Sequence, residues 1–307
     1  MLVRAIMVDV KENGMQATVN VNGTISDSGA AVVSVFDHGF LYGEGIYETL
    51  RTYRGVPFLL DRHLKRLRAS AGMIDLTIPQ DDAALTGAIA DTMASAALEG
   101  EQYLRLLVTR GVGELSYDPS TCPVPTVVII VKPHAENTPE AIEHGITLIT
   151  SSVLRNHPQA INPLIKSNNL LNNALAMQEA IRAGAQEALM RNYLGEISEC
   201  AQSNFFIVAR GEILTPPLHS GLLEGVTRNF ILDVARDVGM TVRESVLEDD
   251  DVRGADEMFI TSTTREVLPV TTLDKKPVGA GVPGPVTLAL ALAFRSRVDE
   301  MTADAAR

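Results

Sequence analysis

Lys166 is the residue of this sequence with the clearest potential for covalent chemistry. Four of the six lysines lie near the start of the chain, among arginines or in a predicted turn, where water is expected to solvate them. Lys132 ends an apolar run, whereas Lys166 stands in the uncharged stretch Ile161–Leu170. An amine in such surroundings is poorly solvated, which favours the neutral form that attacks a carbonyl carbon to form a Schiff base. An ordinary loop lysine is the alternative, and the neighbouring sequence has to decide between the two.

A seat for an anion is expected where a helix begins near Arg228. The segment Gly225-Val226-Thr227 comes directly before this helix. The first backbone N–H groups of a helix have no partner within the helix and carry a partial positive charge, so they bind anions. The Thr227 hydroxyl can add a further donor. A phosphate group is the kind of anion that such an arrangement holds.

The composition is that of a folded globular protein. At 307 residues the chain is long enough for two modest domains, because single cores stop growing at roughly 250–300 residues. Hydrophobic residues make up 46% of the chain and charged residues 21%, which argues against disorder. The formal net charge of −12 argues against a nucleic-acid partner, because binding to a phosphate backbone requires an excess of Lys and Arg.

The cysteine content and the hydropathy of the chain indicate where in the cell the protein is expected to be. The two cysteines, Cys122 and Cys200, lie far apart and suggest neither a disulfide framework nor a zinc site, so no metal is expected. The N-terminal segment lacks the apolar core of a signal peptide, and no run approaches the ~18–20 apolar residues of a membrane span. We therefore expect a cytoplasmic protein with no membrane partner.

The pattern of apolar residues predicts an α+β fold. Helices are expected where apolar residues recur every three or four positions, as Leu60, Leu64 and Leu67 do, and strands where β-branched and apolar residues run together. The predicted strands cover 17–23, 46–53, 103–109, 126–131, 146–151, 187–191, 203–208, 213–215, 258–261 and 267–270, and the predicted helices cover 58–71, 81–98, 169–183, 228–238 and the tail from 284. These elements divide into a small N-terminal α+β domain at 1–134, a connection at 135–143 and a larger C-terminal domain at 144–307.

Five segments, in the same order, resemble the motifs of class IV aminotransferases, which depend on pyridoxal phosphate. They are Tyr42–Arg51, Leu60–Leu67, Ile165–Asn173, Gly195–Phe206, and Leu222–Arg228 together with Thr261–Glu266. One such segment would be a weak signal, but five in order are specific. The family includes branched-chain aminotransferases, D-amino-acid aminotransferases, R-selective amine aminotransferases and aminodeoxychorismate lyases. The resemblance implies the two-domain architecture of fold type IV, with the cofactor between the domains.

The resemblance also implies a role for each cofactor contact. Lys166 would carry the cofactor as a Schiff base, and Glu199 would keep the pyridine nitrogen protonated so that the ring can accept electrons. Arg62 is the candidate for the phosphate, because a guanidinium suits bidentate phosphate contacts, whereas Arg66 and Arg68 fit a basic cluster on a helix surface. The remaining cofactor contacts that the resemblance implies are Ser203, Asn204, Leu223, Val226, Thr227 and Thr263.

Substrate contacts are expected outside the cofactor shell. Tyr103-Leu104-Arg105 resembles the Tyr-x-Arg of branched-chain enzymes, in which the tyrosine hydroxyl helps to hold the substrate carboxylate and the arginine supports it. Thr264 would offer a backbone amide to the same carboxylate. The other substrate contacts that the resemblance implies are Tyr42, Tyr47 and Arg51.

The signals for the substrate class are divided. The loop Gly111–Pro119 lacks the Arg-x-His carboxylate trap of typical D-amino-acid aminotransferases, which favours an L-branched-chain substrate. The segment Leu170–Asn173 looks closer to D-amino-acid enzymes, and Leu171 stands where branched-chain enzymes carry a tyrosine.

We expect a ping-pong transfer of an amino group from an L-branched-chain amino acid to a 2-oxo acid such as 2-oxoglutarate. D-amino-acid or R-amine transamination and aminodeoxychorismate lyase chemistry are the alternatives within the family. A cofactor carrier without catalysis is an alternative of another class, and the presence of Arg51, Tyr103 and Arg105 counts against it. Members of the family build their sites at a dimer interface, so the resemblance implies a homodimer or a larger homo-oligomer.

Overall fold

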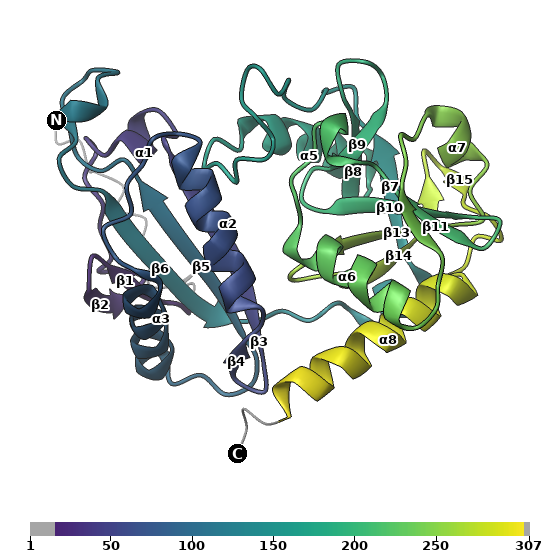
Figure 1. Cartoon of the computed structure of the whole chain (residues 1–307), viewed down its shortest axis with the longest axis horizontal. Helices are drawn as coiled ribbons and strands as arrows, with labels where there is room; N and C mark the ends of the chain where they lie inside the picture. Colours follow the sequence, from purple (N-terminus) through teal and green to yellow (C-terminus); the bar gives the residue numbers. More distant parts are fainter. Residues whose placement is uncertain (1–15, 304–307) are drawn as a thin grey trace, which may run out of the picture.

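The chain folds around two β-sheets, and helices pack against both. The computed structural model describes residues 16–303. The N-terminal part forms a six-stranded sheet and the rest forms a nine-stranded sheet, and Figure 1 shows the two sheets as separate layers joined by a connecting segment and by a long terminal helix.

The first sheet is antiparallel and has the strand order β2-β1-β6-β5-β3-β4. Its strands are β1 (Thr18–Val21), β2 (Thr24–Asp27), β3 (Gly45–Tyr53), β4 (Val56–Pro57), β5 (Gln102–Thr109) and β6 (Thr126–Pro133), and the helices of this region are α1 (His38–Leu41), α2 (Leu60–Gly72) and α3 (Asp82–Ala96), with a short 3-10 turn at Pro119–Thr121. The hairpin between β1 and β2 turns at Asn22 and Gly23, both at positive φ, of 50° and 89°. Two-residue hairpin turns favour such backbone angles.

Alternation along β5 separates a core face from a second face. Leu104, Leu106 and Val108 are buried in the core formed with α2 and α3. Tyr103 and Arg105 alternate with them and are partly exposed. Because successive side chains of a strand point to opposite faces, Tyr103 and Arg105 lie on the face away from these helices. That face is turned toward the rest of the chain.

Helix α2 begins two residues later than its apolar spacing predicts. Leu59 has φ at +53°, in the left-handed region, so the helix begins at Leu60. Leu64 and Leu67 are buried in the core, as their spacing predicts. Leu59 follows the short strand β4, and the periodicity of apolar residues along the helix does not reveal its backbone conformation.

The second sheet is mixed, with the order β12-β11-β10-β13-β14-β7-β8-β9 and with β15 paired to β14. Its strands are β7 (Ile146–Thr150), β8 (Glu187–Arg191), β9 (Ile197–Cys200), β10 (Asn204–Ala209), β11 (Glu212–Thr215), β12 (Val242–Glu244), β13 (Glu257–Ser262), β14 (Glu266–Leu273) and β15 (Lys276–Pro277). The helices are α4 (Pro139–His144), α5 (Leu171–Ala183), α6 (Val226–Asp237), α7 (Asp249–Arg253) and α8 (Pro285–Thr302), with a 3-10 turn at Leu218–Ser220. The pairs β11–β12, β14–β7 and β7–β8 are parallel.

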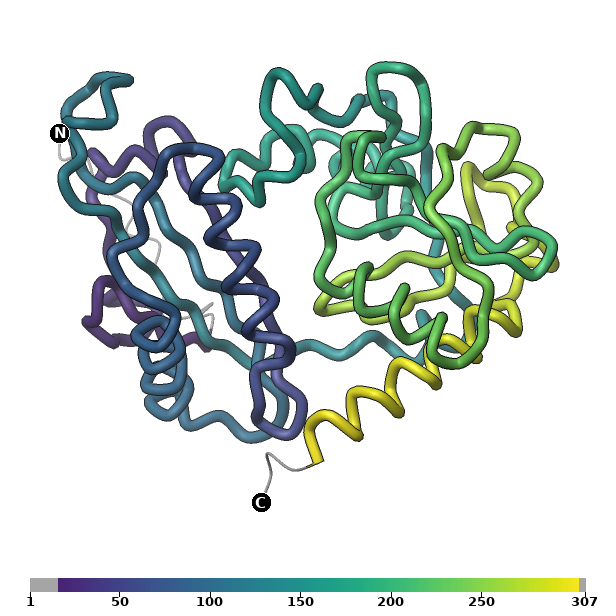
Figure 2. Tube along the Cα trace, viewed as in Figure 1, coloured from purple at the N-terminus to yellow at the C-terminus, as the bar shows by residue number. Residues whose placement is uncertain are grey.

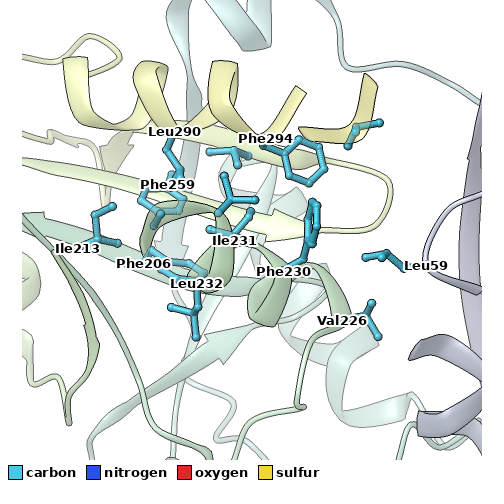
Figure 3. Close-up of a cluster of buried hydrophobic side chains, with 14 of the residues drawn as sticks. Leu59, Phe206, Ile213, Val226, Phe230, Ile231, Leu232, Phe259, Leu290 and Phe294 are labelled. Atoms are coloured by element: carbon cyan, nitrogen blue, oxygen red, sulfur yellow. The ribbon is translucent and has the colours of Figure 1, made fainter. Parts of the chain in front are cut away.

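Both faces of this sheet are buried. Phe206 and Phe259, whose rings stack at 4.7 Å, face α6 and α8, which contribute Phe230 and Phe294 to the same cluster (Figure 3). The neighbouring Phe205 belongs to the core cluster on the other face. A strand buried on both faces reads as a continuous apolar run, which is how β10 reads in the sequence.

Several segments tie the second sheet to the first. Helix α8 runs back to the first sheet, where Asp299 pairs with Arg54 at 3.0 Å (Figure 1). The chain trace in Figure 2 shows the segment between β7 and α5 returning toward the first sheet, where Ser167 forms an isolated β-bridge with Ile46. The connection expected at 135–143 contains most of α4, and the domain limits at 134 and 144 stay a prediction.

Candidate active site

Two adjoining cavities lie between the sheets. The lining of the first, which we call the inner pocket, includes Arg66, Arg155, Lys166, Glu199 and Thr227. The lining of the second, which we call the outer pocket, includes Thr49, Tyr103, Arg105, Met177 and Thr264. Tyr47, Lys166 and Thr263 line both pockets. Lys166 therefore stands where the two pockets meet.

Both backbone polar groups of Lys166 are held by the N-terminal part of the chain. The Tyr47 N–H on β3 donates to the Lys166 carbonyl at 2.9 Å, and the Lys166 N–H donates to the Ser70 hydroxyl on α2 at 3.1 Å. The Asn168 N–H donates to the Gly45 carbonyl at 2.9 Å. A Cβ atom on Gly45 would come within 2.7 Å of the Asn168 side-chain nitrogen. Glycine at this position therefore lets the lysine segment lie against β3.

Glu199 provides a buried carboxylate at the opposite side of the inner pocket. Its Oε1 accepts from the Arg155 Nε at 2.7 Å. Its Oε2 accepts from the Leu223 N–H at 3.1 Å and from the Asn204 side chain at 3.2 Å. Burial raises the pKa of Glu199 above its ordinary value, and the Arg155 guanidinium opposes that rise. The arrangement can place an anionic oxygen beside a protonated ring nitrogen.

An anion seat lies where α6 begins. Gly225 is the N-cap of this helix, and its first turn contains no acidic residue. The hydroxyls of Thr227 and Thr263 lie 3.5 Å apart at this end of the pocket. Thr261 also lines the pocket, and its buried hydroxyl has no hydrogen-bond partner among residues 16–303. Because a buried hydroxyl without a partner is costly, this set of donors fits a phosphate group that would satisfy them.

Arg62, the residue expected to bind phosphate, does not lie in the pocket. Its side chain is 41% exposed, pairs with Asp233 at 3.4 Å and lies over the Phe230 ring at 5.7 Å. Arg66, which the sequence suggested to be a surface arginine, is 12% exposed and lines the inner pocket. The reason is their place along α2, because Arg62 sits in the first turn beside α6 whereas Arg66 is one turn further on, above β3.

A carboxylate on β3 fixes Arg66. Both oxygens of Glu48 accept from its guanidinium, at 2.8 and 2.7 Å, and the third nitrogen donates to the Glu224 carbonyl at 2.8 Å. The His63 ring also contacts Glu48 at 2.7 Å. Burial pushes the pKa of Glu48 upward, but Arg66 and His63 outweigh it and lower this pKa to about 2. Glu48 is therefore ionised and keeps Arg66 aimed along the pocket wall.

Most of the expected substrate contacts line the outer pocket. Tyr47, Tyr103, Arg105 and Thr264 are in its lining. The Arg105 guanidinium lies 4.1 Å from the centre of the Tyr47 ring, and the Lys166 Nζ lies 4.5 Å from the same centre. A hydroxyl and a guanidinium on one strand, facing a lysine amine, can hold a carboxylate near a reacting carbon.

Two of the expected substrate contacts are engaged elsewhere. The buried Arg51 donates to Glu266 and to Glu136, each at 3.1 Å, and does not appear in the lining of either pocket. The Tyr42 ring contacts the ring of Tyr117 and also lies outside both linings. Neither residue therefore lines the pockets of its own chain, and their substrate contacts stay a prediction.

The remaining cofactor contacts lie together. Ser203, Asn204, Leu223, Val226, Thr227 and Thr263 all line the inner pocket. Arg155 is a member of the site that the sequence did not single out, although it is the one Asp, Glu, Lys or Arg between Glu143 and Lys166. Helix α5 also contributes unexpected lining through Ala174, Met177 and Gln178.

Comparison with known proteins finds relatives that match most of the chain. The family model described as Amino-transferase class IV matches residues 45–273. A Methanocaldococcus jannaschii protein named "Putative branched-chain-amino-acid aminotransferase" is 38% identical over 277 residues, which cover 90% of this chain and 95% of that protein. A D-alanine aminotransferase of Bacillus licheniformis is 32% identical over 283 residues, which cover 92% of this chain and 97% of that protein.

A solved structure shares the fold. The branched-chain amino acid aminotransferase of Escherichia coli matches with a TM-score of 0.86 and 33% identity, over 91% of this chain and 93% of that chain. The chain belongs to the class IV aminotransferases. The α+β architecture of fold type IV and the pyridoxal-phosphate-dependent aminotransferase class expected from the motifs are thereby confirmed. Within residues 16–303, no helix combines the length and the apolar character needed to cross a membrane.

Proposed function

We propose that the inner pocket holds pyridoxal 5'-phosphate, with Lys166 as the catalytic residue. The observation that carries the proposal is that one cavity brings together a lysine amine, a buried carboxylate at Glu199 and the start of α6. When bound, this cofactor supplies an aldehyde that joins amines and a ring that takes up the electrons of a carbanion. Arg66, Thr227 and Thr263 hold the phosphate in this proposal, and Glu199 faces the ring nitrogen.

The Lys166 amine has a second task in this reaction. It stands at the junction of the two pockets, so it can take a proton from the Cα of a substrate held in the outer pocket and deliver it to the cofactor carbon on the other side of the amino nitrogen. Its backbone hydrogen bonds to Tyr47 and Ser70 keep the start of the side chain fixed. One site then serves both halves of a ping-pong transfer.

We further propose an L-branched-chain amino acid as the donor and a 2-oxo acid such as 2-oxoglutarate as the acceptor. Tyr103 and Arg105 offer donors for the substrate carboxylate, and Met177 adds apolar surface for a side chain. The likeness to proteins named branched-chain aminotransferases supports this choice.

A D-amino acid is the second candidate substrate. The likeness to a D-alanine aminotransferase favours it, and Leu171, which replaces a tyrosine of branched-chain enzymes, is 66% exposed and lies outside both pocket linings. The branched-chain sequence pattern is therefore incomplete in this chain.

The test is to add one amino donor at a time to the cofactor-loaded protein, with no 2-oxo acid present to accept the amino group. L-Leucine is expected to convert the absorption of the lysine-bound cofactor to that of the amino form, and D-alanine and (R)-phenylethylamine are expected to do so far more slowly. Faster conversion by D-alanine would replace the L-branched-chain proposal with the D-amino-acid one. Release of pyruvate from aminodeoxychorismate without an acceptor would indicate a lyase, and conversion by none of the four compounds would indicate a carrier.

We also propose a homodimer or a larger homo-oligomer. Phe36, Phe40, Leu115 and Tyr117 are large apolar or aromatic side chains that are exposed. Phe36 and Phe40 lie just before and within α1, and Leu115 and Tyr117 lie in the loop after β5. The two segments touch, because the Gly113 N–H donates to the Phe36 carbonyl at 3.2 Å. Grouped apolar residues on a surface are a feature of association sites. Sedimentation of the purified chain is expected to give at least twice the mass of a monomer, and a monomer at micromolar concentration would contradict the proposal.

A further inference from the structure

Two turns form one wall of the outer pocket. The first turn, residues 201–203, joins β9 to β10, and the second turn, residues 263–265, joins β13 to β14. The turns contribute Ala201, Gln202, Thr263 and Thr264 to the lining, and Ser262, the last residue of β13, also lines it. Because β10 pairs with β13 and Asn204 is opposite Thr261, the two turns lie side by side at one end of the sheet.

A buried carboxylate touches both turns from behind. Glu187, the first residue of β8, forms an ion pair with Arg265 of the second turn and accepts from the Ser203 hydroxyl of the first turn at 3.4 Å. The Glu187 side chain is fully buried, and 22% of the Arg265 side chain is exposed. Among the described residues that line the two pockets, neither Glu187 nor Arg265 is present.

The other contacts of Arg265 are made by its backbone. Its N–H donates to the Ser262 carbonyl at 3.2 Å, which closes the second turn, and its carbonyl accepts from the Asn137 side chain at 3.0 Å. Burial raises the pKa of Glu187, and the Arg265 guanidinium opposes that rise. The ion pair is thus the contact that connects the second turn to β8 and, through Ser203, to the first turn.

We propose that Glu187 and Arg265 are positioning residues that set the spacing of the two turns and hence the carboxylate-binding geometry of the outer pocket. The inference rests on the proposed function, because it takes this pocket wall as the place where a substrate carboxylate binds. A displacement of about 1 Å in a binding group can cost up to about a hundredfold in activity, so a contact behind the wall can control binding in front of it.

Two variants separate positioning from stability. Arg265→Met removes the guanidinium but keeps the length of the side chain, and it leaves a buried carboxylate without a cation, so the protein is expected to be less stable. Glu187→Gln combined with Arg265→Met removes both charges with little change in volume, so stability is expected to recover. Neither protein retains the ion pair that joins β8 to the second turn.

The measurement is the Kd of 4-methylvaleric acid, an unreactive carboxylic acid, for the cofactor-loaded protein. Binding is monitored through the change in the absorption of the cofactor. Both variants are expected to raise its Kd by about tenfold or more, and the KM for the amino donor is expected to rise more than kcat falls. Arg191→Met is the matched control, because Arg191 ends the same strand and pairs with Asp249 at 2.8 Å, away from both pockets. It is expected to alter stability without altering the Kd.

A double variant that regains stability and binds the acid within about twofold of the unmodified protein would overturn the inference, because a purely structural ion pair predicts that result. The proposed function is tested separately by turnover. If the unmodified protein binds the acid but converts no amino donor, the proposed function fails while the Kd comparison still decides the role of Glu187 and Arg265. If the unmodified protein does not bind the acid, the inference fails together with the assignment of the outer pocket.

Discussion

The N–H of Tyr47 donates to the carbonyl of Lys166 at 2.9 Å, so one backbone hydrogen bond joins the first sheet to the lysine of the site. The Lys166 N–H is taken by Ser70 on α2, at 3.1 Å. Glu199 and the start of α6 belong instead to the second sheet and its helices. The relative placement of the two sheets therefore sets the distance between the lysine and the groups that would hold a cofactor.

Arg66→Lys is expected to weaken binding of pyridoxal phosphate to the cofactor-free protein. Lysine keeps the charge but loses the planar guanidinium that contacts Glu48 and lines the inner pocket, so Kd is expected to rise about tenfold. The measurement is a titration followed by absorption. Arg62→Lys is the matched control from the same helix, because its side chain pairs with Asp233 outside the pocket. A larger loss of affinity in Arg62→Lys than in Arg66→Lys would show that Arg62 contacts the phosphate and would contradict the proposal.

Glu48 is expected to make the stability of the protein sensitive to acid. Its pKa is lowered from 4.5 to about 2 in the folded chain, so its contribution is fully present above about pH 5 and is lost as the pH falls toward 2. Linkage sets the size of this contribution at up to about 3 kcal/mol. Chemical denaturation at pH 6 and at pH 3 measures the free energy of unfolding. Between these two pH values it should fall less in Glu48→Gln than in the unmodified protein.

The control for this prediction is Glu212→Gln, because Glu212 pairs at 2.9 Å with Arg243, whose side chain is mostly exposed. Exposed ion pairs contribute little to stability. The free energy of unfolding of this variant should therefore fall as much between pH 6 and pH 3 as that of the unmodified protein. Equal losses in Glu48→Gln and Glu212→Gln would contradict the assignment of a stabilising ionised carboxylate at position 48.

Patterns along the chain were sufficient to predict most elements and one side of the site. The resemblance of Tyr103-Leu104-Arg105 to a Tyr-x-Arg motif implies that Tyr103 and Arg105 face the substrate, and both line the outer pocket. The start of α6 was expected to be an anion seat from its glycine and threonine, and it lines the inner pocket. In each case the signal is contained in a few neighbouring residues. The roles of these residues stay proposals.

Contacts across the fold could not be predicted in this way. Arg62 and Arg66 are four positions apart on α2, so the helical period places them on the same side of the helix. The position of Glu48 on β3 decides which of the two arginines lines the pocket. The contacts of Arg51 could not be predicted for the same reason, because its partners Glu136 and Glu266 are distant in the sequence. A charged side chain pairs with a group that the tertiary fold brings near it. Patterns along a single sequence do not reveal which distant residues come that close.

Arg105→Gln is expected to raise the KM for L-leucine by about tenfold while kcat changes less. The guanidinium is one of the few cationic groups of the outer pocket, and loss of a charge-assisted hydrogen bond to a carboxylate costs about 1.5–3 kcal/mol. Steady-state kinetics provide the test. Arg243→Gln is the surface control and should behave as the unmodified protein does. An unchanged KM in Arg105→Gln would show that the carboxylate binds elsewhere.

The central claim is that Lys166 bonds covalently to the cofactor, and reduction of the loaded protein with borohydride tests it most directly. The reduced protein is digested, and mass spectrometry locates the added pyridoxyl phosphate. The account predicts the label on the peptide that contains Lys166 and no label in Lys166→Ala. A label on another lysine, such as Lys132, or no label on the loaded protein would contradict it.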